Sequence, residues 1–104
     1  MGELREVVFI EEIENDFIDC EFSEEKVSKL YDKIVASSKN IYSLTESIKT
    51  FPNNVRKMRV GNYRLFLFID DFTIYCLSIK HRKECYKRKN LHEILTVVRN
   101  IQMK

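Results

Sequence analysis

The sequence predicts an α+β domain in which an antiparallel β-sheet packs against an N-terminal helical hairpin and carries an added C-terminal helix. Two turn signals, Gly61-Asn62 and Asp70-Asp71, separate runs of β-branched, aromatic and aliphatic residues and predict the sheet. Apolar residues at helical spacing before and after these runs predict the helices. The 104 residues suffice for one core and not for two, so we expect a single domain over residues 1–104.

The N-terminal part of the chain predicts one short strand and two helices. Residues 7–10 are rich in β-branched side chains and fit a strand, and residues 11–20 have apolar residues at the spacing of a short helix. Ser23 is expected to cap a second helix, with Glu24 and Glu25 complementing the helix dipole. That helix has an apolar stripe that we expect in the core: Val27, Leu30, Tyr31, Ile34 and Val35. It should end within residues 37–40, whereas residues 41–48 fit no clear pattern.

The turn at Gly61-Asn62 predicts a two-residue hairpin loop in which both residues adopt positive φ. The loop fixes a register between residues 55–60 and 63–69, in which Arg59 lies opposite Arg64 and Lys57 lies opposite Phe66. One face is then apolar, with Met58, Val60, Leu65, Leu67 and Ile69; the other has Lys57, Arg59, Arg64, Phe66 and Phe68. Like charges opposite one another destabilise a strand pair, so this arrangement indicates that the cations bind an anion, unless the long side chains simply splay apart into water.

The second turn, Asp70-Asp71, predicts another hairpin with the strand that begins at Phe72. A two-residue loop at this position places Tyr75 beside Phe66 and Thr73 beside Phe68. Aromatic residues and cations on one surface are typical of single-stranded nucleic-acid binding. For Phe66 and Phe68, however, we favour a second hydrophobic layer covered by another element over base stacking.

The C-terminal residues predict an amphipathic helix over about 87–102. Its apolar positions are Leu91, Ile94, Leu95, Val98 and Ile101. The helix either completes the core permanently or acts as a detachable lid at a partner-binding groove. The first alternative is slightly favoured.

Composition narrows the class of protein. No apolar run is long enough to span a bilayer and no cleavable N-terminal signal is present, so we expect a cytoplasmic protein that does not engage a membrane. Cys20, Cys76 and Cys85 are widely spaced without a C-x-x-C arrangement, which argues against disulfides and a zinc site. His81 and Cys85 alone are too few ligands for a metal. We expect neither a metal nor another cofactor.

Charge is distributed unevenly along the chain, although the formal net charge is only +2. Residues 1–25 contain ten acidic residues and one basic residue, whereas residues 49–89 contain eleven basic and three acidic residues. The basic half is the footprint expected of a phosphate-binding surface, and the acidic run fits a solvated helix face. Residues 80–89 are the densest basic run, and we expect Lys80, His81, Lys83 and Lys87 to contact RNA together with Arg59.

The hairpin region has a specific resemblance. The string R-V-G-N-Y-R-L-F-L-F-I-D at 59–70, followed by a strand and then H-R-K-E-C-Y at 81–86, resembles the C-terminal half of the RelE toxins of toxin–antitoxin pairs, within the RelE/ParE superfamily. Residues before about 51 match only in pattern. The resemblance implies a RelE-like fold and metal-independent cleavage of messenger RNA in the ribosomal decoding site. It also implies a RelB-like antitoxin as partner, while a homodimer is left open.

The resemblance also implies roles for individual residues. Lys57 matches a basic residue assigned to proton abstraction, and Arg64 matches the arginine that stabilises the scissile phosphate. Arg82 matches a proposed proton donor, and Tyr86 matches the tyrosine that stacks on and orients the nucleotide. A second lysine of the family pattern corresponds here to Val55, and the neighbouring Arg56 is expected to face the core.

No Gly-rich phosphate loop, G-x-S-x-G motif or paired carboxylates occur in the basic region. RNA cleavage needs none of these, because the 2′-hydroxyl of RNA can attack the adjacent phosphate once the strand is oriented and the developing charge is stabilised. Two alternatives remain. One is a ParE-like toxin that inhibits gyrase, and the other is a catalytically degenerate homologue that binds RNA or an antitoxin. The missing second lysine supports the latter.

Overall fold

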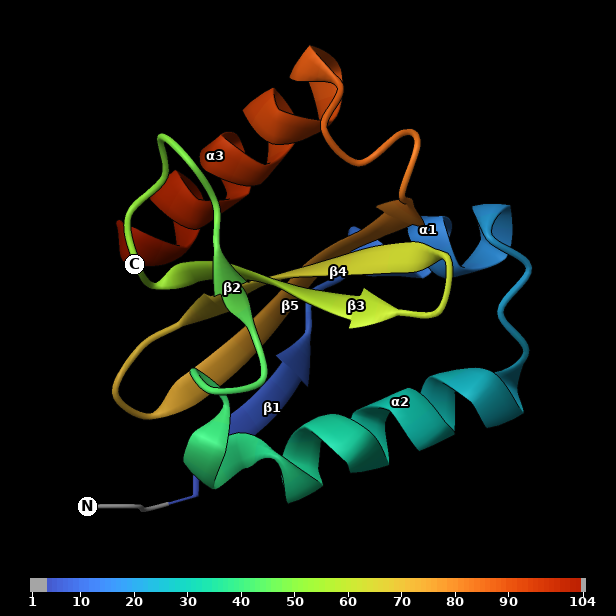
Figure 1. Ribbon diagram of the computed structural model, residues 1–104, viewed down its shortest axis with the longest axis horizontal. Helices are drawn as coiled ribbons and strands as arrows, with labels where there is room; N and C mark the ends of the chain where they lie inside the picture. Colours follow the sequence, from blue (N-terminus) through green and yellow to red (C-terminus); the bar gives the residue numbers. More distant parts are fainter. Residues whose placement is uncertain (1–3, 104) are drawn as a thin grey trace.

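The computed structural model of the protein describes residues 4–103 and contains one five-stranded sheet flanked by helices (Figure 1). The strands are β1 (Glu6–Phe9), β2 (Glu46–Ser47), β3 (Val55–Val60), β4 (Tyr63–Ile69) and β5 (Thr73–His81). Their order in the sheet is β1-β5-β4-β3-β2, and β1 runs parallel to β5 while the other pairs are antiparallel. The sheet is thus mixed at one edge, where the predicted N-terminal strand joins the three antiparallel strands expected from the sequence.

Helices cover both faces of the sheet (Figure 1). The helices α1 (Ile13–Asp19) and α2 (Glu24–Ala36), followed by the 3₁₀ turn Ser38–Asn40, pack with one face; α3 (Arg88–Gln102) covers the other. The first core includes Ile13, Phe17, Leu30, Ile34, Met58, Leu65, Leu67, Ile74 and Ile79. The second core includes Val55, Phe66, Phe68, Leu77, Cys85, Ile94 and Val98. The C-terminal helix therefore covers a second hydrophobic layer on this face of the sheet.

The ends of the first two helices follow ordinary capping chemistry. Ser23 caps α2 as predicted, since its hydroxyl accepts a hydrogen bond of 3.2 Å from the N–H of Lys26. The chain leaves α1 through Glu21, whose φ is +57°. The N–H of Glu21 bonds to the carbonyl of Ile18, and the N–H of Phe22 bonds to that of Phe17. This pair of bonds is a Schellman motif, and the 5.7 Å contact between the Phe17 and Phe22 rings supplies its hydrophobic partner.

The apolar stripe of α2 is only partly buried. Leu30 and Ile34 are in the first core, whereas Tyr31 and Val35 are 40% and 37% exposed. The expectation that the whole stripe is core was therefore too broad. Tyr31 lies at the margin, where its ring meets the edge of Phe9 at 5.6 Å, because the short strand β1 offers too little sheet surface to cover a wide helix face.

The first hairpin has the predicted register. Arg59 lies opposite Arg64, Lys57 opposite Phe66, and Val60 opposite Tyr63. Only one of the two loop residues has positive φ: Gly61 is at +58°, and Asn62 is not among the positive-φ residues of the described chain. The turn thus needs glycine at its first central position, as a type II′ turn does, rather than at both.

The second hairpin differs from its prediction by one residue. The N–H of Asp70 bonds to the carbonyl of Thr73, so the turn centres on Asp71 and Phe72. The cause is the Asp70 carboxylate, which accepts hydrogen bonds from the N–H groups of Phe72 and Thr73 at 2.9 and 2.7 Å. Tyr75 is therefore opposite Phe68 and not Phe66, and its ring stacks on Phe68 with 5.9 Å between centroids.

A β-bulge in β5 shifts the register further along this hairpin. Phe66 pairs with Ser78 and Leu67 pairs with Cys76, which leaves Leu77 as the extra residue. Leu77 and Ser78 consequently both face α3: Leu77 enters the second core, and the Ser78 hydroxyl bonds to Asn90.

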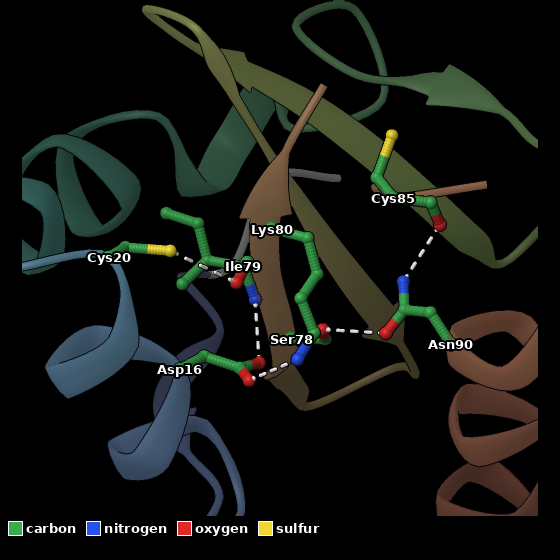
Figure 2. Close-up of polar contacts among 7 residues, drawn as sticks. All are labelled: Asp16, Cys20, Ser78, Ile79, Lys80, Cys85 and Asn90. Carbon is green, nitrogen blue, oxygen red and sulfur yellow. Dashed lines mark hydrogen bonds and ion pairs between the residues drawn. The ribbon is translucent and has the colours of Figure 1, made fainter. Parts of the chain in front are cut away.

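The far half of β5 has α1 along its edge where β1 has ended (Figure 2). The Asp16 carboxylate accepts a hydrogen bond of 3.1 Å from the N–H of Ile79, and the Cys20 thiol lies 3.8 Å from the Ile79 carbonyl. These side chains occupy positions that a neighbouring strand would otherwise fill.

Candidate functional site

The centre of the candidate site is a contact between Lys57 on β3 and Tyr86 in the loop after β5. The Lys57 ammonium donates a hydrogen bond of 2.5 Å to the Tyr86 hydroxyl and lies 4.9 Å from the centroid of the ring. The ring also meets the edge of the buried Phe66 at 6.3 Å. Tyr86 nevertheless remains 46% exposed. Two residues predicted for catalysis, 29 positions apart in the chain, are thus brought together at the surface.

Arg59 and Arg64 lie opposite each other on β3 and β4, close to the turn of the first hairpin. Arg59 is exposed, and Arg64 opposite it is half-buried. The Arg64 guanidinium donates to the carbonyls of Tyr63 and Gly61 at 2.9 and 3.3 Å, so the hairpin turn holds it in place. Among the described residues, neither arginine belongs to an ion pair. No carboxylate of residues 4–103 therefore supplies the anion that their apposition suggests.

Arg82 joins the cluster through the backbone. Its N–H bonds to the carbonyl of Asn62 at 2.8 Å, which continues the β4–β5 ladder by one residue and ties the loop to the first hairpin turn. The Arg82 side chain is exposed. Lys57 contacts Tyr86, and Arg64 comes from the strand next to that of Lys57. The backbone of Arg82 is tied to the first hairpin turn, so the four predicted catalytic residues come from one end of the sheet.

Two residues without a predicted role hold the loop that presents Tyr86 (Figure 2). The Asn90 amide donates to the Cys85 carbonyl at 2.8 Å, and its oxygen accepts from the Ser78 hydroxyl at 3.3 Å. Cys85 itself is completely buried, and its thiol lies 3.4 Å from the Arg82 carbonyl. Burial raises the pKa of the Cys85 thiol, although the nearby charges of Arg64 and Lys57 act in the opposite direction. The available sequence signal for this support was an asparagine in the first turn of the amphipathic helix, four positions before the apolar Ile94.

The remaining basic residues are placed differently. Lys80 extends from β5 toward α1, where its ammonium lies 2.6 Å from an oxygen of Asp16 (Figure 2). Burial alone would lower the pKa of Lys80, but the hydrogen bond and charge of Asp16 outweigh it, so the pKa is raised. An ammonium held by a mostly buried carboxylate is poorly placed to contact RNA. We therefore leave Lys80 out of the site.

His81 and the loop lysines complete the predicted set. The His81 ring packs edge-on against Tyr63 at 5.7 Å, on the opposite side of the sheet from Arg64. It lies apart from the cluster, so we also leave His81, which was expected to contact RNA, out of the site. Lys83 is exposed, and Lys87 pairs with Glu84 at 2.7 Å, where the hydrogen bond from Lys87 lowers the pKa of the exposed Glu84 carboxyl.

The position of the missing second lysine is part of the core. Val55 is fully buried with the residues under α3. Arg56 points to the other side, as expected, and is only 8% exposed. Its guanidinium bonds to Thr45, Asn53 and the carbonyl of Tyr42. Arg56 therefore cannot replace the lysine without breaking this network.

Phe66 and Phe68 are unavailable for base stacking. They are 0% and 4% exposed beneath α3, so the expected second hydrophobic layer is correct and Tyr86 is left as the exposed ring beside the cations. Within residues 4–103 no three His, Cys, Asp or Glu side chains are grouped to hold a metal ion. No helix in the same part of the chain is long and apolar enough to cross a membrane.

No protein-family model matches the sequence, and no curated protein matches it significantly. Solved structures do match. A chain of the RelBE2 toxin–antitoxin complex from Mycobacterium tuberculosis aligns with 77% of this chain and 100% of its own length, at 19% identity and a TM-score of 0.59. A chain of the RelB–RelE complex from Methanococcus jannaschii aligns with 76% of this chain and 94% of its own length, at 25% identity and a TM-score of 0.54. A chain of the DinJ–YafQ toxin–antitoxin complex from Escherichia coli aligns with 82% of this chain and 100% of its own length, at 8% identity and a TM-score of 0.61.

The fold of this chain is therefore that of the RelE-type toxins. The predicted fold class is confirmed, including the helix that follows the last strand. The low identities mean that the likeness concerns the arrangement of the backbone. The RelBE2 chain is covered in full, while 23% of this chain lies outside the alignment.

Proposed function

We propose that the protein is the toxin of a type II toxin–antitoxin pair and that it cleaves messenger RNA on the ribosome. The observation that carries this proposal is the convergence of Lys57, Arg64, Arg82 and Tyr86 at one end of the sheet, on a fold shared with RelE-type toxins. In the hairpin at the centre of the cluster, two arginines face each other without an anion from the described chain.

The arrangement suits cleavage in which the RNA supplies its own nucleophile. Tyr86 offers an exposed ring for an unstacked base, and the adjacent Lys57 and Arg64 offer positive charge to the phosphate. When the 2′-hydroxyl attacks, negative charge builds on the phosphorane, and fixed cations stabilise it. The proton-transfer roles of Lys57 and Arg82 rest on the family resemblance alone. Charge stabilisation follows from the guanidinium and ammonium groups themselves.

The proposed partners follow from the same reading. The ribosome would present the message, so the protein would act in the cytoplasm. An antitoxin similar to RelB would neutralise it, since the matching chains from Mycobacterium tuberculosis and Methanococcus jannaschii come from toxin–antitoxin complexes. Lys83 and Lys87, exposed beside Tyr86 in the loop, are further candidates for contacts with RNA phosphates, as is Arg59.

A second candidate is a catalytically degenerate homologue that still binds RNA or an antitoxin. The buried Val55 favours it, because a lysine of the family pattern is replaced by a core residue and no neighbouring cation takes its place. This candidate predicts binding without cleavage.

Mapping of transcript ends after brief induction tests the proposal. The wild-type protein should arrest translation and produce new 5′ ends within translated messages. Arg64→Ala and Arg82→Ala should reduce these ends by orders of magnitude and remain folded, because exposed or half-buried cations in a crowded cluster contribute little to stability. The matched control is Arg99→Ala, which removes the charge of an exposed arginine on α3, outside the cationic cluster. Intact messages together with inhibited gyrase supercoiling would support a ParE-like activity instead.

A further inference from the structure

A second feature adjoins the candidate site on the side of α3. An open pocket of about 410 Å³ lies between this helix and the loop that precedes β3, and the two segments run beside each other in Figure 1. Its lining is Thr50, Phe51, Tyr86, Arg88, Leu91, His92 and Leu95. The volume lies within the range of small-molecule sites. Tyr86 belongs both to this pocket and to the contact with Lys57, so the pocket is continuous with the cationic cluster.

The lining has the chemistry of a base-binding site. Phe51, Leu91 and Leu95 provide apolar surface, and Tyr86 provides an exposed ring. Arg88 and His92, four residues apart on α3, provide the polar groups. Sequence-specific RNA recognition uses this combination, in which an unstacked base rests on an aromatic ring while side chains hydrogen-bond to its edge.

The rim of the pocket also has an unusual backbone. The N–H of Phe51 bonds to the carbonyl of Ile48, which closes a turn with Thr50 at its second central position. Thr50 has φ of +75°, in the region where such turns ordinarily place glycine or asparagine. Positive φ is rare for a β-branched residue, and strained backbone concentrates at ligand sites. This loop conformation places Thr50 and Phe51 against the pocket.

We infer that this pocket binds one unstacked RNA base next to the phosphate held by the cationic cluster, and that Arg88 selects a base with acceptor atoms on its edge. The inference rests on the proposed function. A guanidinium only donates hydrogen bonds, and the edge of guanine offers two acceptors, N7 and O6, where adenine offers one acceptor and one donor. Guanine is therefore preferred over adenine, and both purines over pyrimidines, whose rings cover less of the apolar lining. His92 provides a second edge contact and is, with Arg88, a specificity-determining residue.

The binding test uses the intact protein and single nucleotides. Methyl NMR spectra are recorded during titration with GMP, AMP, CMP and UMP. GMP should bind most tightly and shift the methyl signals of Leu91 and Leu95. Arg88→Gln should weaken GMP binding about tenfold and leave UMP binding almost unchanged. The matched control is Lys89→Gln, which removes one charge from the same turn of α3 at a residue outside the pocket. Equal effects of the two variants, or shifts confined to residues far from α3, would overturn the inference.

A cleavage test separates this inference from the proposed function and identifies the source of the base. Messages that differ only in the base beside the cut are digested on ribosomes by the wild type and by Arg88→Gln. Loss of a guanine preference in the variant supports a messenger base. If GMP binds the pocket but the messenger base has no influence, the pocket takes a ribosomal base. If messages are cut while no nucleotide perturbs Leu91 or Leu95, the inference fails and the proposed function stands. If no message is cut but GMP still binds in an Arg88-dependent way, the proposed function fails and the pocket stands.

Discussion

The Tyr86 hydroxyl accepts a hydrogen bond from the Lys57 ammonium, and this contact joins strand β3 to the loop after β5. Neither element could place its side chain alone. The register of the first hairpin directs Lys57 to the second face of the sheet. The hydrogen bonds of Asn90 and the burial of Cys85 fix the loop that presents Tyr86. The proposed site therefore depends on a polar support that is shared with α3.

The Lys57–Tyr86 contact predicts a graded response to substitution. Lys57→Met should lower the single-turnover rate of cleavage on ribosomes by about 100-fold or more, the range of a lost proton-transfer group. Tyr86→Phe should lower it less, because the ring that stacks on a base remains. Both variants should melt within about 1 kcal/mol of the wild type, since the hydrogen bond is at the surface. Full cleavage by Lys57→Met would exclude Lys57 from the mechanism.

The first hairpin shows how far local sequence can determine structure. Gly61-Asn62 fixed the loop, and period-two alternation then gave the correct partner for Lys57 and for Arg59. In the second hairpin the same reasoning failed by one residue. The Asp70 carboxylate moved the turn, and the extra residue Leu77 moved the register again. Side-chain capping and bulges are local events, but their positions depend on what packs against the strand.

In the candidate site, too, contacts between residues far apart in the sequence could not be predicted from local patterns. Lys80 was expected to contact RNA, and in the sheet it lies opposite Arg64. No short-range pattern revealed that Asp16, 64 residues earlier, would hold its ammonium. The burial of Val55 likewise required knowledge that α3 covers that part of the sheet. The family resemblance identified the cationic cluster, but the supporting Ser78 and Asn90 became visible only in three dimensions.

The turn after α1 predicts a stabilising substitution. Glu21 has φ of +57°, a conformation that costs an ordinary residue about 1 kcal/mol and glycine almost nothing. Glu21→Gly should therefore raise the free energy of unfolding by up to about 1 kcal/mol, less the extra entropy of glycine in the unfolded chain. Urea denaturation measures this. The matched control is Glu14→Gly within α1, which should destabilise by about 1 kcal/mol. Destabilisation by Glu21→Gly would show that the side chain has another role.

The second core predicts that α3 is a permanent part of the fold. Ile94 is 2% exposed, and Ile94→Ala should lower the free energy of unfolding by about 2–5 kcal/mol. Thr96→Ala, at an exposed position of the same helix, should change it by less than about 0.5 kcal/mol. Truncation after Arg88 should abolish the cooperative thermal melt, because Phe66, Phe68 and Leu77 lose their cover. A truncated chain that still melts cooperatively would support the detachable-lid alternative.

The buried thiol of Cys76 predicts a loss of stability at alkaline pH. Burial raises the pKa of this thiol from 9.0 to about 12, so the unfolded chain releases the proton at lower pH than the folded chain does. The contribution is complete below pH 9 and is lost as the pH rises toward 12. Between pH 9 and 10 the loss should be about 1 kcal/mol. In this interval Lys80, whose pKa is raised from 10.5, remains charged and contributes little.

Urea unfolding at pH 8, 9 and 10 measures this dependence. Cys76→Ala should be less stable than the wild type at every pH, because it leaves a cavity, but its stability should fall less between pH 9 and 10. The matched control is Cys20→Ala: burial also raises the pKa of Cys20, but this thiol lies at the edge of β5 rather than in the core. Its removal should change the slope less than removal of Cys76. Parallel pH profiles for the wild type and Cys76→Ala would mean that the thiol ionises as readily in the folded protein as in the unfolded chain. Water would then have to reach the core between the sheet and α1.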